Sequence, residues 1–504
     1  MVFTMKSKYG IRLLCLILSL LSVIGVLAAC ADTNQPSTET KVPSGTEPED
    51  TTVRSDLPDK DLEGYEFSVL QWYCMAWPNR MNKDLVAVEP TGDPINDAVY
   101  SRNARLTEKY NFTVSMENFT ETEVIAMIRS SVSTGDDMYD MVSARVNDVP
   151  PVLLEGCFLD FETAFQYVNL DKPYWDQSVR EALSFANRVY LMSSSLCLSD
   201  QDATSAVAFN KAYAADYNMP NYYDIVQNGQ WTFEKLYESM TAFDGDTNGD
   251  GKMKPDDDIY GFLGGDDVMM SFYFGGGGTF TEKDEDDLPV FNFANEKNYD
   301  IADAVLDIMY DDAFMNHHAI SNQDDGYYRS LFVDGHGLFF WMRMDDVITM
   351  RGDDAIDFGV LPVPKFNEEQ QHYLSLISQH TSGLMSVLTC EQNTDYVGFC
   401  LEALSAASYY DLQKAYYDVT LKTKSARDDE SQDMLDIIFA HRILDIGEIA
   451  NFGGFSSTFL RYGSSNLSKK LKAIASTYAS AESKIESDIE SFLDKIEKLE
   501  DYAA

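Results

Sequence analysis

The chain has 504 residues, more than one hydrophobic core usually organises, so we expect at least two lobes. Its 38 basic and 83 acidic side chains give a net charge of -45, which repels nucleic-acid phosphates and anionic lipid head groups. This charge excludes nucleic acid as a partner and leaves neutral or cationic ligands, metal ions and proteins.

The N-terminus has the features of an export signal. Lys6, Lys8 and Arg12 precede the apolar run "LLCLILSLLSVIGVLAA", which is short for a membrane span and ends in small side chains. We therefore predict a signal peptide over residues 1–29. The run ends in "LAAC", which resembles the lipobox of bacterial lipoproteins, and this resemblance implies that Cys30 is acylated and anchors the mature chain. The alternative is an ordinary signal peptide with an incidental cysteine.

Residues 30–60 are predicted to form a disordered tether. They contain almost no large apolar side chains and many Thr, Ser, Pro and acidic residues, so they cannot bury enough surface to become ordered. Such a tether would let a folded body stand away from the membrane.

The first folded segments alternate between strand and helix. Strands are predicted at residues 63–72, 111–117 and 138–144, where aromatic and β-branched residues gather or alternate with polar ones. Between them lie two predicted helices, 92–110, which Asp93 can cap, and 121–133. Alternation at this spacing predicts parallel strands joined by crossover helices, which is the beginning of an open α/β sheet.

The later elements follow the same pattern. We predict helices at 229–243, capped by Thr232, and at 298–314, then a buried strand in "GHGLFFWMR" at 335–343. A long amphipathic helical stretch is expected from residue 467 to 499. Trp175 and Trp231 are expected to be structural.

The acidic segment "DTNGDGKMKPDD" fits a calcium loop of the EF-hand type, with Gly251 at the sharp turn. In this frame the oxygen ligands come from Asp246, Asn248, Asp250, the Lys252 carbonyl and Asp257. Aspartate at the last position is shorter than the usual glutamate, which weakens the site. We expect a structural calcium ion that braces one lobe, and the alternative is a solvated acidic turn.

Catalytic motifs are missing from the sequence. It contains no H-E-x-x-H, G-x-S-x-G, G-x-x-x-x-G-K-[ST] or G-x-G-x-x-G pattern. A pair of carboxylates able to hydrolyse glycosides could be present among 83 acids, but so many acids make any one pair uninformative. We therefore expect a protein that is not an enzyme.

Five segments, at 92–114, 205–236, 245–262, 357–373 and 409–438, resemble the extracellular solute-binding lipoproteins of bacterial ABC-type sugar importers. The resemblance covers roughly residues 60 to 450. It implies a periplasmic-binding-protein-like α/β fold with two hinge-connected lobes and extra C-terminal helices, in which the chain crosses between lobes at 189–211 and returns at 357–365. The implied first lobe comprises 61–195 with about 300–360, and the second comprises about 196–299 with 361–504.

Ligands of open α/β sheets bind beyond the carboxyl ends of the parallel strands. Aromatic side chains at these ends can pack against sugar rings, and Arg or Asp can bond the hydroxyls. The candidate ligand-binding residues are Trp72, Tyr73, Trp77, Arg145, Trp341 and Arg343, with Asp202 on the first crossing. For each aromatic residue the alternative is packing in the core.

Together these features predict a lipid-anchored, monomeric binding protein on the extracellular face of the cell membrane. It would capture a sugar or oligosaccharide and deliver it to an ABC permease, touching the membrane only through its anchor. The alternatives are a surface glycan-degrading enzyme and an adhesive lipoprotein without a permease. Peptides and other solutes stay open as ligands, because this fold accepts many of them.

Overall fold

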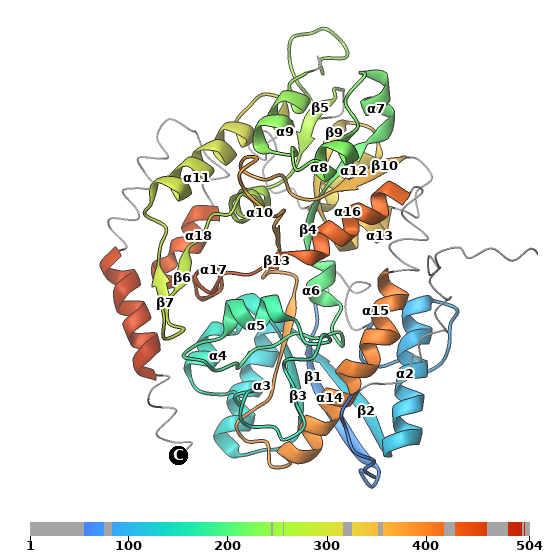
Figure 1. Ribbon diagram of the computed structural model, residues 1–504, viewed down its shortest axis with the longest axis vertical. Helices are drawn as coiled ribbons and strands as arrows, with labels where there is room; N and C mark the ends of the chain where they lie inside the picture. The colour runs from blue at the N-terminus through green and yellow to red at the C-terminus, as the bar shows by residue number, and fades with distance from the viewer. Residues whose placement is uncertain are drawn as a thin grey trace, which may run out of the picture. The chain divides into compact units, whose positions relative to one another are not determined.

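The computed structural model describes residues 55–74, 83–242, 245–255, 257–315, 325–350, 356–417, 429–460, 482–495 and 498. These residues belong to one compact unit, Thr52–Ala504. Their strands form two main sheets, one around β1 and β3 and the other around β4 and β9, with α6 and β13 between the two groups (Figure 1).

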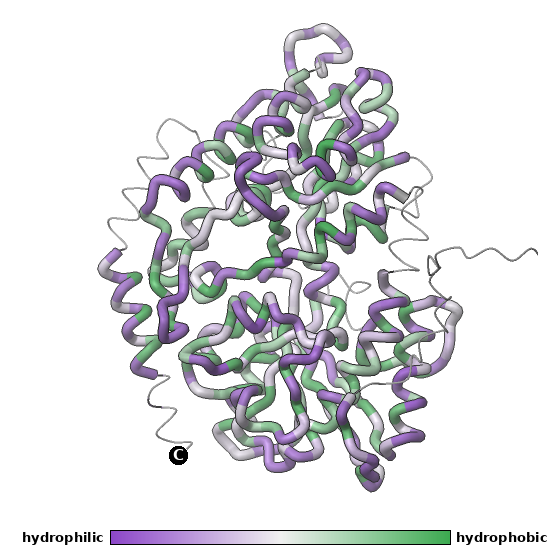
Figure 2. Tube along the Cα trace, in the orientation of Figure 1, coloured by the Kyte–Doolittle hydropathy of each residue, from purple (hydrophilic) through white to green (hydrophobic). Residues whose placement is uncertain are grey.

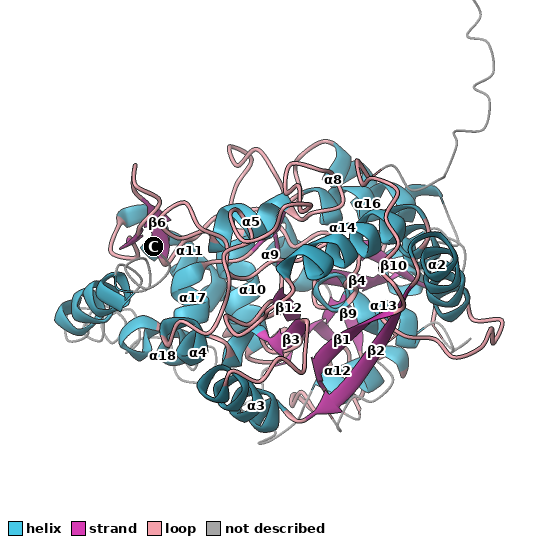
Figure 3. Cartoon of the chain, turned by 90° about the horizontal axis from the view of Figure 1, so that it is seen from below, coloured by secondary structure: helices cyan, strands magenta, loops and turns pink. Residues whose placement is uncertain are grey.

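The first sheet has four strands. In spatial order they are β12 (Gly383–Ser386), β3 (Met141–Arg145), β1 (Tyr65–Trp72) and β2 (Phe112–Phe119). β1 is parallel to both β2 and β3, whereas β12 is antiparallel to β3. The crossover helices are α2 (Pro94–Tyr110) and α3 (Glu121–Thr134), and they lie beside the sheet in Figure 3. The predicted open α/β sheet is therefore confirmed.

Helix α2 shows how local sequence sets these elements. Asp93 accepts hydrogen bonds from the backbone N–H groups of Ile95 and Asn96, both at 3.0 Å, and Pro94 occupies the first turn, where its missing N–H costs nothing. The helix ends at Asn111, which adopts the left-handed conformation with φ 56°. Its buried face packs against α14 (Thr394–Tyr410), so a distant segment completes this part of the core.

The second sheet has five strands. In spatial order they are β10 (Phe358–Leu361), β4 (Ser205–Asn210), β9 (Gly337–Arg343), β5 (Tyr260–Leu263) and β8 (Phe314–Met315). The central strand β9 is antiparallel to β4 and parallel to β5, and all of its residues are buried. The prediction that about 300–360 joins the first lobe was wrong, because β8, β9 and β10 all pair within this second sheet. Strand β9 carries apolar side chains on both faces, so it has to lie in the middle of a sheet, and the second sheet provides that position.

Helices cover both sheets. They are α4 (Pro150–Leu154), α5 (Gln177–Leu183), α6 (Ser199–Asp202), α7 (Lys211–Asp216), α8 (Tyr222–Gln227), α9 (Phe233–Met240), α10 (Asp267–Gly275), α11 (Glu296–Met309), α12 (Asp325–Val333), α13 (Met344–Met350), α15 (Leu412–Lys414), α16 (Asp429–Ala440), α17 (Ile446–Ala450) and α18 (Phe455–Leu460). Two short pairs complete the strands, β6 (Thr281–Lys283) with β7 (Pro289–Phe291) and β11 (Ser375–Leu376) with β13 (Arg442–Ile443). Hydrophilic and hydrophobic stretches alternate along α11, as expected for a helix with one buried face (Figure 2).

The predicted C-terminal helix is confirmed over 482–495, and the rest of its predicted range is described only at residue 498. Ile485 and Phe492 are buried, and the ring of Phe492 meets that of Phe185 with centroids 4.3 Å apart. Trp175 and Trp231 are buried and structural, as predicted: the Trp231 indole N–H donates to the carbonyl of Pro362 at 2.9 Å.

The chain crosses between the sheets where predicted at 189–211: Met192 pairs with Met385 beside the first sheet, and β4 lies in the second. The predicted return at 357–365 was wrong, because that segment holds β10. The chain reaches the first sheet later, at β12. A proline-containing segment after a strand resembles a crossing, but here Pro362 follows an edge strand.

Candidate ligand-binding site

A cavity of about 200 Å³ lies where the two sheets approach each other. Asn147 comes from just beyond β3 of the first sheet, and Ser205 and Trp341 come from β4 and β9 of the second. The remaining lining residues come from α10, the β11–β12 connection, α17 and α18, and they are Asp267, Met270, Leu376, Ser378, Gln379, His380, Glu448, Asn451, Ser456 and Ser457. The cavity is therefore built by both halves of the molecule, at the ends of their strands.

Several buried polar atoms on this lining have no hydrogen-bond partner. They are the Trp341 indole nitrogen, the Ser205 hydroxyl, Oε1 of Gln379 and Oε2 of Glu448. An unsatisfied buried polar atom costs about 1–3 kcal/mol, so such atoms are rare in native proteins. Four such atoms line one small cavity, so a ligand with hydroxyl or amino groups could supply the hydrogen bonds that they lack.

Glu448 is fixed in this wall by the start of α17. Asp445 caps the helix by accepting the backbone N–H groups of Gly447 and Glu448, at 2.7 and 3.0 Å. The Glu448 side chain then accepts a 3.1 Å hydrogen bond from the Gln379 amide through Oε1. Burial, together with the nearby carboxylates of Asp445 and Asp267, raises the pKa of Glu448 well above its ordinary value. The buried position of Glu448 therefore favours its protonated form over its ionised form.

Two arginines flank the site on the side of His380. Burial and the charge of Arg145 lower the pKa of His380, with a further contribution from Arg343, so its imidazole is neutral near pH 7. The Arg145 guanidinium lies 5.9 Å from the ring centroid of Trp72, and that of Arg343 lies 5.7 Å from the ring centroid of Trp341. The structure thus brings four predicted ligand residues to the junction of the sheets.

Both arginines are already engaged by carboxylates. Arg145 bonds Asp148 at 2.6 Å and lies 3.4 Å from Glu121, while Arg343 lies 3.6 Å from Asp345. Their charges are therefore compensated within the protein.

Trp72, Tyr73 and Asp202 do not line the cavity. Trp72 is fully buried, with an unpartnered indole nitrogen, and packs against Gly383. Tyr73 is partly exposed, and Trp77 lies outside the described residues. Asp202 accepts a hydrogen bond from the Tyr416 hydroxyl at 2.9 Å and pairs with the Lys83 ammonium at 2.5 Å.

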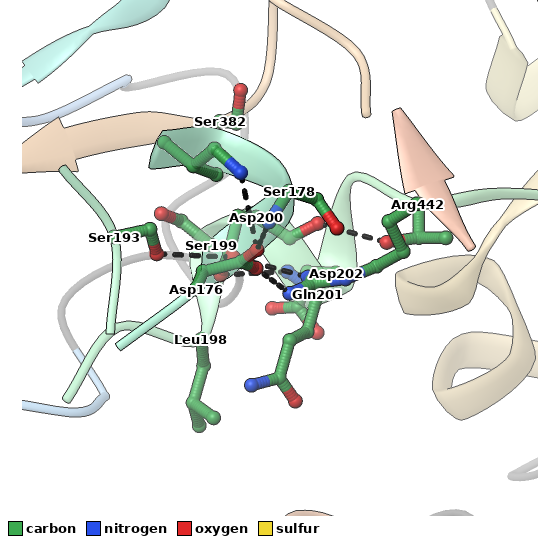
Figure 4. Close-up of polar contacts among 12 residues, drawn as sticks. Asp176, Ser178, Ser193, Leu198, Ser199, Asp200, Gln201, Asp202, Ser382 and Arg442 are labelled. Carbon is green, nitrogen blue, oxygen red and sulfur yellow. Dashed lines mark hydrogen bonds and ion pairs between the residues drawn. The ribbon is translucent and has the colours of Figure 1, made fainter. Parts of the chain in front are cut away.

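A buried polar network holds the crossing segment at α6 (Figure 4). Arg442 of β13 pairs with Asp176, which caps α5, and with Asp200 of α6, at 3.0 Å to the latter. Ser193 also donates to Asp200 at 3.0 Å. Burial raises the pKa of Asp200 to about 6, although the Arg442 charge opposes this shift. The network ties three distant segments together beside the candidate site.

A larger hollow of about 630 Å³ is lined in part by Arg442, and several polar groups in and around it are paired within the protein. The Trp175 indole and the Tyr174 hydroxyl both donate to Glu402, and Asp436 accepts from Tyr417. The smaller cavity is therefore the better candidate for a ligand site.

Sequence reasoning missed Asn147, Gln379, His380 and Glu448. Asn147 lies in a short 3-10 turn, and Gln379 and His380 lie in the connection between β11 and β12. In such segments the sequence shows no periodic pattern from which a site could be predicted. Glu448 had one available signal, because it is a single glutamate between Ile446 and Ile449 in an otherwise apolar stretch.

In the acidic loop the predicted calcium ligands bond the loop itself. The Asp246 carboxylate accepts the backbone N–H groups of Gly249 and Gly251, at 2.8 and 2.7 Å, and Gly251 has φ +73° as the frame requires. The Lys254 ammonium lies 2.8 Å from Asp250 and 3.6 Å from Asp257. Across the described ranges, no group of three or more His, Cys, Asp or Glu side chains is arranged to hold a metal ion. Calcium binding stays a prediction.

The predicted signal peptide and Cys30 lie outside the described residues. Among the helices that the structure does describe, none has the length and apolar character needed to cross a membrane.

No family model and no curated protein matches the sequence. Solved structures do match, at low identity. An ABC substrate-binding protein from Listeria monocytogenes, in complex with cycloalternan, is 11% identical with a TM-score of 0.52, over 83% of this chain and 99% of that one. UspC from M. tuberculosis is 14% identical with a TM-score of 0.55, over 84% and 100%.

The galacto-N-biose-/lacto-N-biose I-binding protein of the ABC transporter from Bifidobacterium longum, in complex with lacto-N-biose, is 11% identical with a TM-score of 0.51, over 86% and 99%. Each of the three matches covers more than four fifths of this chain. The chain therefore has the two-lobed α/β fold of the substrate-binding proteins of ABC transporters.

Proposed function

We propose that this protein binds a sugar or oligosaccharide outside the cell and delivers it to an ABC importer, without chemical conversion of the ligand. The observation that carries the proposal is the set of unpartnered buried polar atoms around the cavity beside Trp341. Two similar structures hold carbohydrates, cycloalternan and lacto-N-biose, which supports this ligand class.

The chemistry of the wall suits a polyhydroxylated ligand. Sugar hydroxyls both donate and accept, so they can satisfy the Trp341 N–H, the Ser205 hydroxyl and the Gln379 carbonyl oxygen at once. The Trp341 ring adds an apolar surface of the kind that packs against sugar rings. An apolar ligand would leave the same atoms unpaired, and each would keep its cost.

The test is a thermal-shift screen of the purified protein over a panel of mono- and oligosaccharides, followed by calorimetry on each hit. Trp341→Phe keeps an aromatic ring but removes the indole N–H, and we expect it to weaken binding about tenfold. Tyr237→Ala, on the exposed surface of α9, is the control that should bind normally. Failure of every glycan to stabilise the protein would refute the proposal, and release of product from a polysaccharide would favour the glycan-degrading alternative.

The proposed place of action is the outer face of the cell membrane. Residues 1–29 would direct export, Cys30 would carry the acyl chains, and 30–60 would form the tether. The Cys30→Ser protein should appear in the medium rather than with membranes, and equal membrane association of both forms would count against the anchor. Copurification of the anchored protein with permease subunits would separate a transport role from simple adhesion.

We further propose that the loop at 246–257 binds calcium weakly and braces the second sheet. A calcium ion would displace the Lys254 ammonium from Asp250 and Asp257 and draw the same carboxylates together. Calcium should therefore raise the melting temperature of the wild type, and less so in Asp246→Asn. No shift up to several millimolar calcium would contradict the prediction.

A further inference from the structure

A second hollow of the molecule has the features of a ligand site. It is the space of about 630 Å³ that Arg442 lines in part, called here the Arg442 hollow, and it shares no lining residue with the cavity beside Trp341. We propose that the Arg442 hollow is a second carbohydrate site, which binds an uncharged oligosaccharide through Gln201, Ser195 and the ring of Tyr409. This inference goes beyond the proposed function, because it concerns a ligand held outside the cavity beside Trp341.

The Arg442 hollow lies between elements of the two sheets. Tyr409 belongs to α14, which packs on α2 beside the first sheet, and Phe439 belongs to α16, which packs on β10 of the second. Gln201 of α6 comes from the segment that crosses between the sheets. The volume of about 630 Å³ falls within the range of about 300–1,000 Å³ that is typical of ligand pockets. The hollow is also larger than the cavity of about 200 Å³, so it has room for a longer glycan.

Two buried polar side chains of the hollow have no hydrogen-bond partner among the described residues. Gln201 and Ser195 are each 9% exposed, and neither the Gln201 amide nor the Ser195 hydroxyl is bonded to another described group. In Figure 4 the Gln201 side chain points away from Asp200 and Arg442, so its amide takes no part in their network. A buried amide without a partner is rare, because it costs about 1–3 kcal/mol. Ligand hydroxyls, which both donate and accept, would satisfy both groups.

The charges on the lining balance one another. Asp176 and Asp436 are matched by Lys414 and Arg442, so the lining has no net charge in a chain whose net charge is -45. Arg442 is paired with Asp176 within the protein. Lys414 and Asp436 are exposed at the rim, where solvent and salt screen their charges. A charged ligand would therefore lose hydration without gaining a counter-ion at the floor of the hollow, which favours an uncharged ligand.

The aromatic side chains of the hollow suit sugar rings. Tyr409 is 38% exposed, and Tyr417 and Phe439 are half-buried, with their ring centroids 5.9 Å apart and their planes at 74°. Aromatic faces that remain accessible in this way can pack against the apolar faces of sugars. The combination of these rings with an amide and a hydroxyl is the chemistry expected of a glycan site.

Other uncharged ligands fit less well. A purely apolar molecule would cover the Gln201 amide and the Ser195 hydroxyl without bonding them, so both would keep their cost. An extended peptide binds by adding main-chain hydrogen bonds to a sheet edge. The described lining includes one residue of a named strand, Arg442 of the two-residue strand β13, so it offers a peptide no edge of useful length.

The experiment titrates maltotriose, cellotriose and mannotriose into the full chain and into three variants, with binding measured by calorimetry. Gln201→Leu keeps the approximate shape of the side chain and removes its donor and acceptor, whereas Tyr409→Ala removes an exposed ring. We expect at least one trisaccharide whose affinity falls about tenfold in each of these two variants. Trp341→Phe should change the same affinity by less than about twofold, because the two sites share no residue.

Tyr100→Ala is the matched control for Tyr409→Ala, since it removes a ring that is 37% exposed on α2, and it should bind as the wild type does. Gln201→Leu should keep the wild-type melting temperature, because its amide has no partner to lose, and Tyr409→Ala keeps the test valid if that variant does not fold.

Binding of no trisaccharide, or an affinity unchanged in both Gln201→Leu and Tyr409→Ala, would overturn this inference. Loss of trisaccharide binding in Trp341→Phe alone would also overturn it, and would support the proposed function instead. The proposed function fails separately, if no glycan of the wider panel stabilises the protein.

Discussion

Replacement of Glu391 by glutamine should stabilise the protein in a pH-dependent way. Glu391 is 8% exposed and lies beside Asp137 and Asp140 at the edge of the first sheet. Burial raises its pKa from 4.5 to about 8, and the two neighbouring carboxylates add to the shift. Between these two pH values the folded protein holds a proton that the unfolded chain has released, so the free energy of unfolding falls as pH rises through this window.

The magnitude follows from the same two values. The interval from 4.5 to pH 7 spans two and a half pKa units, which is worth about 3.5 kcal/mol at about 1.4 kcal/mol per unit. Three carboxylates share the effect, so we expect glutamine to recover about 1–3 kcal/mol near pH 7. Its side-chain amide N–H takes the place of the O–H donor of the protonated carboxyl. Its amide oxygen can still accept from the backbone N–H of Asn393, as Glu391 does at 2.5 Å.

Urea denaturation of wild type, Glu391→Gln and the surface control Glu108→Gln provides the measurement. The gain should be close to zero below pH 4.5, grow as pH rises to about 8, and then level off, whereas the control should show no such trend. A variant that is less stable at neutral pH, or a gain that does not vary with pH, would refute the reasoning.

Three further changes test the packing. Arg442→Met leaves two buried aspartates without a counter-ion, so it should lower the free energy of unfolding by about 3–5 kcal/mol, and a loss below about 1 kcal/mol in urea would contradict the network. Gly383→Ala places a Cβ 2.6 Å from the Trp72 indole nitrogen, so it should cost about 1–3 kcal/mol and change tryptophan fluorescence. Unchanged stability and an unchanged spectrum would contradict this close contact. Asp93→Ala removes the cap of α2 and should cost about 1 kcal/mol in the same assay, while Asp93→Asn should cost far less.

The elements that sequence pattern predicted well are those whose signal is local. Asp93 and Thr232 cap helices because of their own side chains, and Trp341 lies in a strand because its neighbours are apolar on both faces. The assignment of residues to sheets depends on pairing between distant segments, which no local pattern encodes, and there the prediction for about 300–360 failed.

The residues of the candidate site likewise fall into two groups, those that a local sequence pattern indicates and those that only tertiary packing brings to the cavity. Trp341 and Arg343 were found because they lie toward the carboxyl end of a recognisable buried strand. Glu448 and Gln379 reach the cavity through short helical and loop segments whose positions depend on the packing of the whole C-terminal part. Their role becomes visible only through tertiary geometry, as atoms that lack a partner.

The pairing of β12 with β3 governs how the chain must fold. Gly383 lies opposite Arg145, and Arg343 lies opposite Ser205, so each sheet joins strands that are synthesised far apart in time. A growing polypeptide therefore has to keep the open edge of β3 unoccupied until most of its length has emerged. An unpaired strand edge of this kind is a target for wrong pairing with other chains, so late completion of the sheet lengthens the time over which such pairing can occur.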